Sequence, residues 1–266
     1  MSEDKQKLNS FSVIIPTMGR HLAKRAIQSI QNQIYDGDIE IVIVYDPRDM
    51  SKKEEFGNML DELSKQDVRI KVVKLERNMQ RVVATNAGLK NATKDWICLL
   101  DDDDEYIRTY LYSMNYAINE NPDYSIFHFG AIVNKVNITR WRECPEIKEG
   151  GPNNEAMERF RSGLLGLGSF IFKREILDET GYLPEGKDLS PYSFADAAKE
   201  KYPELIEWYG PKYMEGGKEI GNPWGQDYLL FYMITRKRKS KGLSLMPYIQ
   251  YVRRGGFHFQ DDNLTI

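Results

Sequence analysis

The stretch WICLLDDDDE, residues 96–105, joins five residues that favour burial to four aspartates and a glutamate. The apolar part has the length of a β-strand buried in a sheet, and the aspartates mark the point where that strand ends. Neighbouring carboxylates repel one another, and turn chemistry needs only one Asp or Asn. We therefore expect a positive partner at this point, and a divalent metal ion is the candidate.

On both sides of this stretch, short apolar runs alternate with helical patterns. Strands alternating with helices predict right-handed crossovers and a mainly parallel sheet buried on both faces. Ligands of such sheets bind beyond the carboxyl ends of the strands, where the aspartates lie. Ser51 and Glu54 have capping-box spacing at the start of one helix. The predicted strands are FSVIIP (11–16), IEIVIVYD (39–46), VRIKVVKL (68–75) and WICLL (96–100), with helical patterns over 20–33 and 51–66 and through Ala84, Ala87 and Leu89.

The pattern changes in the second part of the chain. Apolar residues from 107 to 118 have helical spacing, and 124–133 and 164–172 are predicted strands. Residues 184–224 are rich in Pro, Gly and aromatic side chains without a clear period, which is typical of a functional excursion or a small subdomain. No segment separates two domains, so we expect one domain over 1–266.

Composition excludes several classes of protein. With 37 Lys and Arg against 40 Asp and Glu, the net charge is −3, so no overall field attracts nucleic acid or an anionic membrane. The two cysteines, Cys98 and Cys144, exclude a disulfide scaffold. The polar N-terminus and the lack of a long apolar window predict no signal peptide, no transmembrane segment and a cytoplasmic location. The oligomeric state stays open.

The acidic run has two interpretations. In extended backbone, Asp101 and Asp103 share one side, and Asp102 and Asp104 share the other. Two carboxylates can bind Mg²⁺ or Mn²⁺ while water and substrate phosphates complete the coordination shell. The alternative is a solvated acidic turn, or acidic residues at a helix N-terminus.

Several segments, in this order, resemble a family 2 glycosyltransferase with the GT-A fold. A hydrophobic strand delivers the family's D-x-D motif, here at 101–104, and Gln80 stands where the family usually has glycine. The match runs from about residue 11 to about residue 260. The other matching segments are SVIIPT (12–17), NMQRVVATNAG (78–88), GLGSFIFKREILDETGYLPE (166–185) and WGQDYLL (224–230).

The resemblance implies an α/β fold: a Rossmann-like, mainly parallel central sheet flanked by helices, with an acceptor-side excursion. Residues 11–105 would form the half that binds the nucleotide-sugar, and 106–266 the acceptor half. The implied activity is metal-dependent transfer of a sugar from a nucleotide-diphosphate donor, with UDP-sugars favoured, to a glycan or other hydroxyl acceptor. The implied cofactor is Mn²⁺ or Mg²⁺.

The same resemblance assigns roles to residues. Asp103 is the first choice for metal ligand, Asp101 meets the ribose or the metal, and His258 is a third ligand or an ordinary strand-end histidine. Asp227 is the general base, or else it caps the helix that follows. Asp46 meets uracil or ribose, or else belongs to an Asp-Pro turn. Acceptor contacts fall on Trp224 and on Gln226, which replaces the commoner glutamate, and donor contacts on Pro16, Thr17, Arg20, Asp46, Asn78, Arg81, Asn86, Asp101, Asp102, Arg253 and Arg254.

Other functions stay open at this point. The basic cluster RKRKSK (236–241) is either a solvated helix end or a contact for a polyanion. In the second case, the acceptor would be a hydroxylated base in DNA, with aromatic residues of the excursion stacking on bases. A nucleotidyltransferase would need a glycine-rich loop, which IIPTMGRH (14–21) lacks. The remaining alternative is a non-catalytic sugar-binding protein; His21 and His128 are expected to be ordinary surface or packed histidines.

Overall fold

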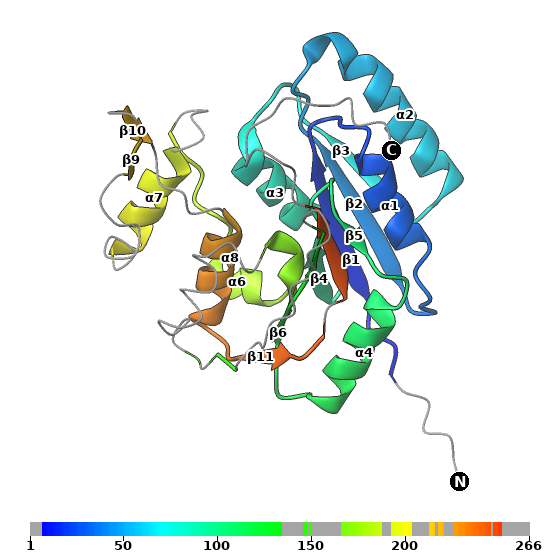
Figure 1. The fold of residues 1–266 in the computed structure, drawn as a ribbon, viewed down its shortest axis with the longest axis vertical. Helices are drawn as coiled ribbons and strands as arrows, with labels where there is room; N and C mark the ends of the chain where they lie inside the picture. The colour runs from blue at the N-terminus through cyan, green and yellow to red at the C-terminus, as the bar shows by residue number, and fades with distance from the viewer. Residues whose placement is uncertain are drawn as a thin grey trace.

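The computed structural model describes residues 7–134, 146–147, 149, 166–187, 193–203, 213–215, 218–220, 226–245 and 247–251. Its centre is a seven-stranded sheet in the order β11-β6-β8-β4-β1-β2-β3 (Figure 1). Within it β8 is antiparallel to β4 and β6, and the other pairs are parallel. The strands are β1 (Phe11–Thr17), β2 (Ile39–Tyr45), β3 (Ile70–Lys74), β4 (Trp96–Leu99), β6 (Ile126–Phe129), β8 (Phe170–Lys173) and β11 (Ser240–Leu243). The predicted fold class is confirmed.

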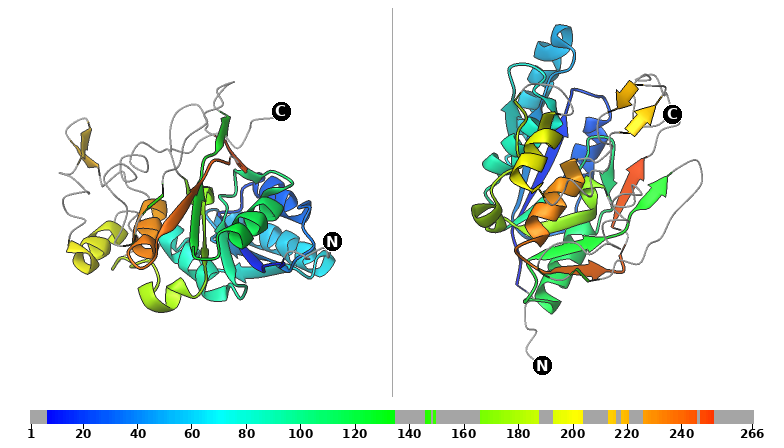
Figure 2. Two further views of the ribbon diagram at one scale, coloured as in Figure 1. Left: turned by 90° about the horizontal axis from the view of Figure 1, so that it is seen from below. Right: turned by 90° about the vertical axis from the view of Figure 1, so that its left-hand side faces the viewer.

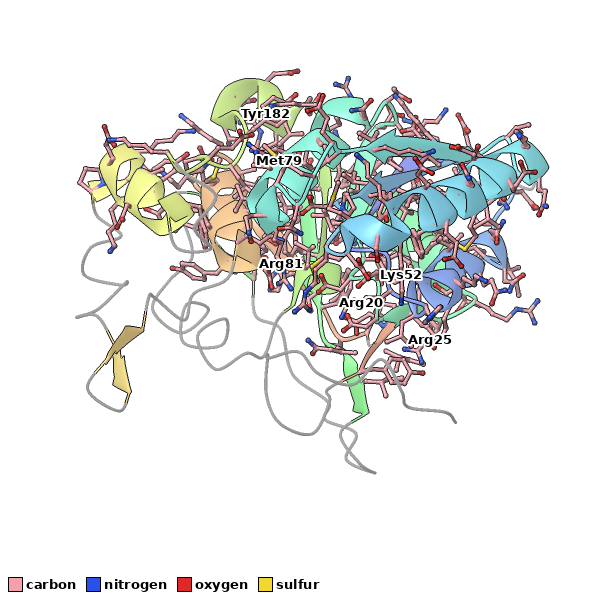
Figure 3. The ribbon with its side chains drawn as sticks, turned by 90° about the horizontal axis from the view of Figure 1, so that it is seen from above. Arg20, Arg25, Lys52, Met79, Arg81 and Tyr182 are labelled. Atoms are coloured by element: carbon pink, nitrogen blue, oxygen red, sulfur yellow. The ribbon has the colours of Figure 1, made fainter. Side chains whose placement is uncertain are left out.

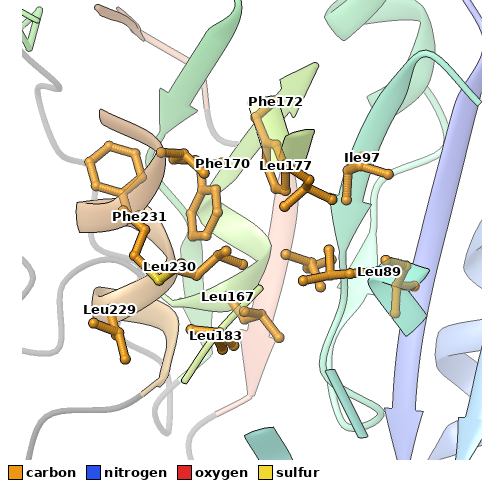
Figure 4. Close-up of a cluster of buried hydrophobic side chains, with 14 of the residues drawn as sticks. Leu89, Ile97, Leu167, Phe170, Phe172, Leu177, Leu183, Leu229, Leu230 and Phe231 are labelled. Atoms are coloured by element: carbon orange, nitrogen blue, oxygen red, sulfur yellow. The ribbon is translucent and has the colours of Figure 1, made fainter. Parts of the chain in front are cut away.

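Helices cover both faces of the sheet because successive side chains of a strand point to opposite faces. Val13 and Ile15 of β1 pack with α1, α2 and α4, whereas Ile14 packs with α3, α6 and α8. Figure 4 shows the second cluster, in which Phe231 of α8 lies against Phe170 of β8. The helices are α1 (Ala23–Gln31), α2 (Lys53–Gln66), α3 (Gln80–Asn91), α4 (Tyr110–Glu120), α6 (Ile176–Thr180) and α8 (Gln226–Thr235).

A smaller sheet stands beside the first one (Figure 2). It contains β5 (Glu105–Tyr106), β12 (Tyr248–Tyr251) and β7 (Ile132–Asn134), with β12 in the middle. The predicted strand over 124–133 is therefore two strands in two sheets. The chain leaves the large sheet at Gly130, whose N–H donates to the C=O of Leu245 (3.1 Å).

Part of the excursion is also described. It contains α7 (Ser193–Lys201) and an antiparallel pair of short strands, β9 (Tyr213–Glu215) and β10 (Lys218–Ile220). Ala198 of α7 is fully buried in the cluster around α8. Among the described residues, no helix has both the length and the apolar character that spanning a membrane requires.

Two local predictions were wrong. Ser51 does not form a capping box: its N–H and hydroxyl both bond to the carboxylate of Asp49, which caps a short 3₁₀ turn before α2. In the described part of the predicted strand 164–172, residues 167–169 form a 3₁₀ turn in which Gly166 and Ser169 bond to each other, and the strand begins at Phe170. In both places a nearby polar side chain satisfies backbone groups that the expected structure would have paired differently.

Gly88 lets α3 approach the sheet closely. A methyl group on Gly88 would overlap Cγ2 of Ile14 and lie 3.3 Å from Cγ2 of Val44. We predict that Gly88→Ala lowers the free energy of unfolding by about 1–3 kcal/mol, as overpacking does in other cores. Gly57→Ala is the control, since its methyl group would meet only the flexible side chain of Lys74, at 3.5 Å. That change should stabilise α2 by up to about 1 kcal/mol. Urea denaturation measures both, and equal effects would contradict the prediction.

Candidate active site

The four aspartates form a turn at the carboxyl end of β4, in the middle of the sheet. The N–H of Asp104 donates to the C=O of Asp101 (3.0 Å), so the backbone is not extended as expected. The side chains still separate into the two predicted pairs. Asp102 and Asp104 are 2% and 3% exposed, whereas Asp101 and Asp103 are partly exposed. The more accessible pair is the one predicted to hold a metal.

Arg20, in the turn after β1, holds two of these carboxylates. Its Nε donates to Asp102 Oδ2 (3.2 Å), its Nη2 contacts Asp102 Oδ1, and its Nη1 donates to Asp103 Oδ2 (3.0 Å). The hydroxyl of Thr17 donates to Asp102 Oδ2 (2.6 Å). Because β1 and β4 are parallel neighbours, their carboxyl ends meet at one edge. Thr17, Arg20 and Asp102, all predicted donor residues, therefore lie together.

Arg25 of α1 holds the outer end of the acidic turn. Its Nη2 donates to the C=O of Asp103 (2.7 Å), and its Nε lies 2.7 Å from Glu105 Oε1. Its guanidinium group also stacks on the ring of Tyr251, 3.9 Å from the centroid. The N–H of Tyr251 in turn donates to Asp104 Oδ1 (2.9 Å). We did not predict Arg25 or Tyr251 as site residues, because no local pattern placed β12 beside the acidic turn.

Arg81, in the first turn of α3, faces acids from both halves of the chain. Burial acts to lower its pKa, but the charges of Asp101, Asp227, Asp103 and Asp104 together outweigh burial, and the net shift is upward. Asp227 lies in the first turn of α8. Its Oδ1 is buried and has no hydrogen-bond partner among the described residues, and burial raises its pKa while the charge of Arg81 opposes that shift. The charge of Arg81 thus acts on both the predicted base and the acidic turn.

Three arginines therefore surround the acidic turn. Arg20, Arg25 and Arg81 come from different elements, and Figure 3 shows them along one edge of the molecule. The chain itself supplies positive charge that we had expected only from a metal ion. The positive charge does not fully offset the burial of Asp101. Burial raises the pKa of this carboxyl to about 6 although the charge of Arg81 opposes the shift.

Asp101 and Asp103 are suitable oxygen ligands for Mg²⁺ or Mn²⁺. The side chain of Asp103 is 22% exposed, and a nearby cation would favour the ionised form of Asp101. Among the described residues, no three His, Cys, Asp or Glu side chains are arranged to hold an ion. Bound phosphate oxygens and water would have to complete the shell. Metal binding by these two residues stays a prediction.

Asp46, directly after β2, fixes the start of α3. Its carboxylate is 3% exposed and accepts the N–H of Met79 (2.6 Å). Burial raises the pKa of Asp46, and bonds from the N–H groups of Met79 and Gln80 oppose that shift. Gln80 has φ +73°, a backbone conformation that favours glycine, which is the usual residue of the family segment at this position. A contact between Asp46 and a nucleotide stays a prediction.

Two predicted site residues use their side-chain amides within the protein. Asn86 donates to the C=O of Leu183 (2.9 Å) and to Glu185 Oε1 (2.8 Å), and accepts the N–H of Leu183 (3.1 Å). Gln226 accepts from the hydroxyl of Thr85 (3.2 Å), and its Nε2 is buried without a partner among the described residues. These bonds join α3 to the segment after α6 and to α8. Ligand contacts of both residues stay predictions.

The remaining residues named from the sequence divide into three groups. Pro16 in β1 and Asn78 before α3 are partly exposed, near the carboxyl ends of their strands. Of the two possibilities left open for His128, a surface or a packed histidine, the structure shows the packed one: its ring bonds to Ser240 Oγ (2.6 Å) and it is 1% exposed. The residues that lie outside the described part of the chain are Trp224, Arg253, Arg254, His258 and Cys144.

The basic cluster 236–241 does not present one uniform charged face. Arg238 pairs with Glu179, and Lys239 lies over the ring of Tyr124, 4.3 Å from its centroid. Lys241 lies 3.9 Å from Glu146 Oε2. The cluster follows α8 and leads into the edge strand β11. These contacts favour the interpretation as a helix end over a polyanion site.

A cavity of about 390 Å³ lies at the opposite edge of the sheet. Asp95 and Trp96, at the amino end of β4, belong to its lining, as do Lys173, the last residue of β8, and Arg174, which follows it. None of its lining residues belongs to the acidic turn or contacts it through a described hydrogen bond. The cavity is therefore separate from the candidate active site.

A helix-covered parallel sheet with an acidic turn at the carboxyl end of its middle strand defines a GT-A-type fold. The family model described as "Glycosyl transferase family 2" matches residues 12–181, which is more than half of the chain. The chain belongs to this family.

Individual relatives agree with this assignment. The GalNAc(5)-diNAcBac-PP-undecaprenol beta-1,3-glucosyltransferase of Campylobacter jejuni subsp. jejuni serotype O:2 is 35% identical over 112 residues, which cover 41% of this chain and 34% of that protein. The crystal structure of S. aureus TarS superposes with a TM-score of 0.60 at 18% identity, over 91% of this chain and 37% of TarS. TarS 1–349 in complex with UDP-GlcNAc gives 0.58, also at 18% identity, over 92% of this chain and 59% of that one. This chain matches about a third of the length of the Campylobacter glucosyltransferase.

Asp101 should make the metal-free protein less stable as the pH rises. Its folded pKa of about 6 exceeds the ordinary value of 3.8, so wild-type stability falls between about pH 4 and pH 6. We predict that Asp101→Asn raises the free energy of unfolding by about 1–3 kcal/mol at pH 7 and has no such effect below about pH 4, where both states are protonated. Urea denaturation in EDTA measures this difference.

Asp123→Asn, an exposed acidic residue after α4, is the matched control. Its effect should stay within about 0.5 kcal/mol at every pH, as for most surface substitutions. An effect of Asp101→Asn that does not change with pH would contradict the role assigned to its buried charge.

Proposed function

We propose that the chain is a metal-dependent glycosyltransferase. It moves a sugar from a UDP-sugar to a hydroxyl group of a glycan or another acceptor, with inversion at the anomeric carbon. The observation that carries this proposal is that the charge of Arg81 interacts with both Asp101, in the half predicted to bind the donor, and Asp227, in the half predicted to bind the acceptor, so that the two carboxylates raise its pKa together. Residues needed at the two ends of a transfer reaction thus share one electrostatic site.

The donor lies over the carboxyl ends of β1, β2 and β4. Breaking the bond between the anomeric carbon and the diphosphate leaves negative charge on phosphate oxygens, and fixed positive groups stabilise that charge. Arg20 and Arg81 provide such groups, because guanidinium binds phosphate oxygens with a rigid fork of donors. Mn²⁺ or Mg²⁺ held by Asp101 and Asp103 would supply Lewis-acid stabilisation of the same charge.

The acceptor hydroxyl loses its proton as it attacks, and Asp227 accepts that proton. Its buried Oδ1 has no partner among the described residues and is therefore available as an acceptor. Burial raises the pKa of Asp227, which makes it a stronger base, while Arg81 favours the ionised form that a base requires. One displacement, with the base opposite the leaving group, inverts the anomeric carbon.

The choice of a UDP-linked donor is supported by similar proteins. TarS 1–349, which has the same fold, has been crystallised with UDP-GlcNAc and with UDP. The Campylobacter relative is a glucosyltransferase. A screen of nucleotide-sugars for thermal stabilisation with Mn²⁺ identifies the donor, because a ligand of the native state raises its stability. Donor hydrolysis that depends on Mn²⁺ then distinguishes an enzyme from a non-catalytic sugar-binding protein.

Asp103→Ala tests the donor site. We predict that it abolishes the Mn²⁺-dependent part of donor binding, because the turn then retains only one accessible metal ligand. Isothermal titration with the UDP-sugar, with Mn²⁺ and with EDTA, measures this part. Asp123→Ala removes an exposed carboxylate elsewhere and should bind like wild type. Equal donor affinity of Asp103→Ala and wild type in Mn²⁺ would refute the assigned role.

Asp227→Asn tests the base. We expect donor affinity to change less than threefold, while kcat falls by about 10²–10⁴, because the amide cannot accept the proton. Asp178→Asn changes an exposed acid in the first turn of α6 and serves as the control. Turnover by Asp227→Asn near the wild-type rate would exclude Asp227 as the base.

A further inference from the structure

Arg20 divides its donors unequally between two carboxylates. Two of its nitrogens, Nε and Nη2, bond to the two oxygens of Asp102, and only Nη1 bonds to Asp103. Asp102 is 2% exposed and also receives the Thr17 hydroxyl, whereas Asp103 is 22% exposed. The link to Asp102 is therefore buried and fixed, and the link to Asp103 is a single bond open to solvent.

This asymmetry allows one link to break while the other remains. An exposed ion pair contributes little free energy, whereas a bidentate pair that is buried and supported by a second donor is hard to separate. Asp103 can therefore turn away from Arg20 without moving the guanidinium group. After this change, Nη1 keeps its position beside the acidic turn with an N–H that needs an acceptor.

We propose that Arg20 is an exchangeable counter-ion that couples the binding of the metal to the binding of the donor. In the free protein, Nη1 pairs with Asp103. When Asp103 turns to the metal, the vacated N–H of Nη1 binds a phosphate oxygen of the donor. This inference rests on the proposed function, because it takes Asp103 as a metal ligand and a nucleoside diphosphate group as the anion.

The coupling has a direct electrostatic cause. With a metal bound alone, Asp103 would no longer pair with Arg20, and the guanidinium cation would stand beside a dication without that counter-ion, which is unfavourable. A diphosphate that arrives with the metal offers oxygens to both cations. The metal and the nucleotide should therefore each bind more tightly in the presence of the other, by the same factor.

Arg25 provides the matched comparison. It is a second arginine at the same turn, but it donates to the backbone C=O of Asp103 and pairs with Glu105, and not with the carboxylate of Asp103. Replacing Arg25 removes one positive charge from the neighbourhood and leaves the pair between Arg20 and Asp103 in place. Any effect of charge alone should therefore appear in both variants.

The test measures the dissociation constant of Mn²⁺ by electron paramagnetic resonance, without nucleotide and with saturating UDP, in the full chain. For wild type we expect UDP to tighten Mn²⁺ binding by tenfold or more, within the usual range of coupling between sites, about 5- to 150-fold. In Arg20→Gln, Mn²⁺ alone should bind about tenfold more tightly and the coupling should fall by about the same factor. Arg25→Gln should keep the wild-type coupling.

Arg20→Lys covers the case in which Arg20→Gln fails to fold, because its ammonium group can stay on the buried Asp102 but cannot serve both carboxylates. It should change Mn²⁺ binding in the same direction as Arg20→Gln. Unchanged coupling in the folded Arg20 variants, or an equal loss in Arg25→Gln, overturns the inference while the proposed function stands. A wild-type chain that binds no Mn²⁺ even with UDP overturns both the inference and the proposed metal site.

Discussion

The constraint on which the site depends is the neutralisation of four adjacent carboxylates at the end of a buried strand. Each carboxylate needs a partner, since isolated charges are costly to bury. Arg20 and Thr17 bond to Asp102, while the N–H of Tyr251 bonds to Asp104. These partners come from β1, from the turn after it and from the last described strand. The acidic turn thereby holds together parts of the chain that are distant in sequence.

The neutralisation of these carboxylates is not complete. The remaining cost in folding free energy lies at the proposed active site. Asp101 keeps a raised pKa of about 6 because burial outweighs the charge of Arg81. Gln80 adds backbone strain at the start of α3, where its φ is +73°. A sequence selected only for stability would avoid both features. Both features agree with the general observation that functional sites lower stability.

Much of the site was predictable from sequence, and the missing part has a clear reason. Thr17, Arg20 and Asp102 were predicted as donor residues from the resemblance of their segments, and the structure brings the three side chains together. Arg25 and Tyr251 were not predicted, because their relevance depends on the stacking of one on the other across more than 200 residues of chain. The capping box at Ser51 was wrong because Asp49 supplies the better-placed acceptor. Sequence rules for helix ends and turns compare only partners that lie a few residues apart in the chain.

The sequence by itself determined the mainly parallel sheet and the edge at which the candidate site lies. Burial and periodicity are properties of neighbouring residues, so strands such as FSVIIP and WICLL are visible without any knowledge of their partners. Only the tertiary structure decided which charges meet at that edge. The order of strands, with β4 between β1 and the antiparallel β8, places Arg20 beside Asp102, and the packing of α3 near α8 brings Arg81 within electrostatic reach of both Asp101 and Asp227. Strand order and helix packing depend on long-range burial, which no local pattern specifies.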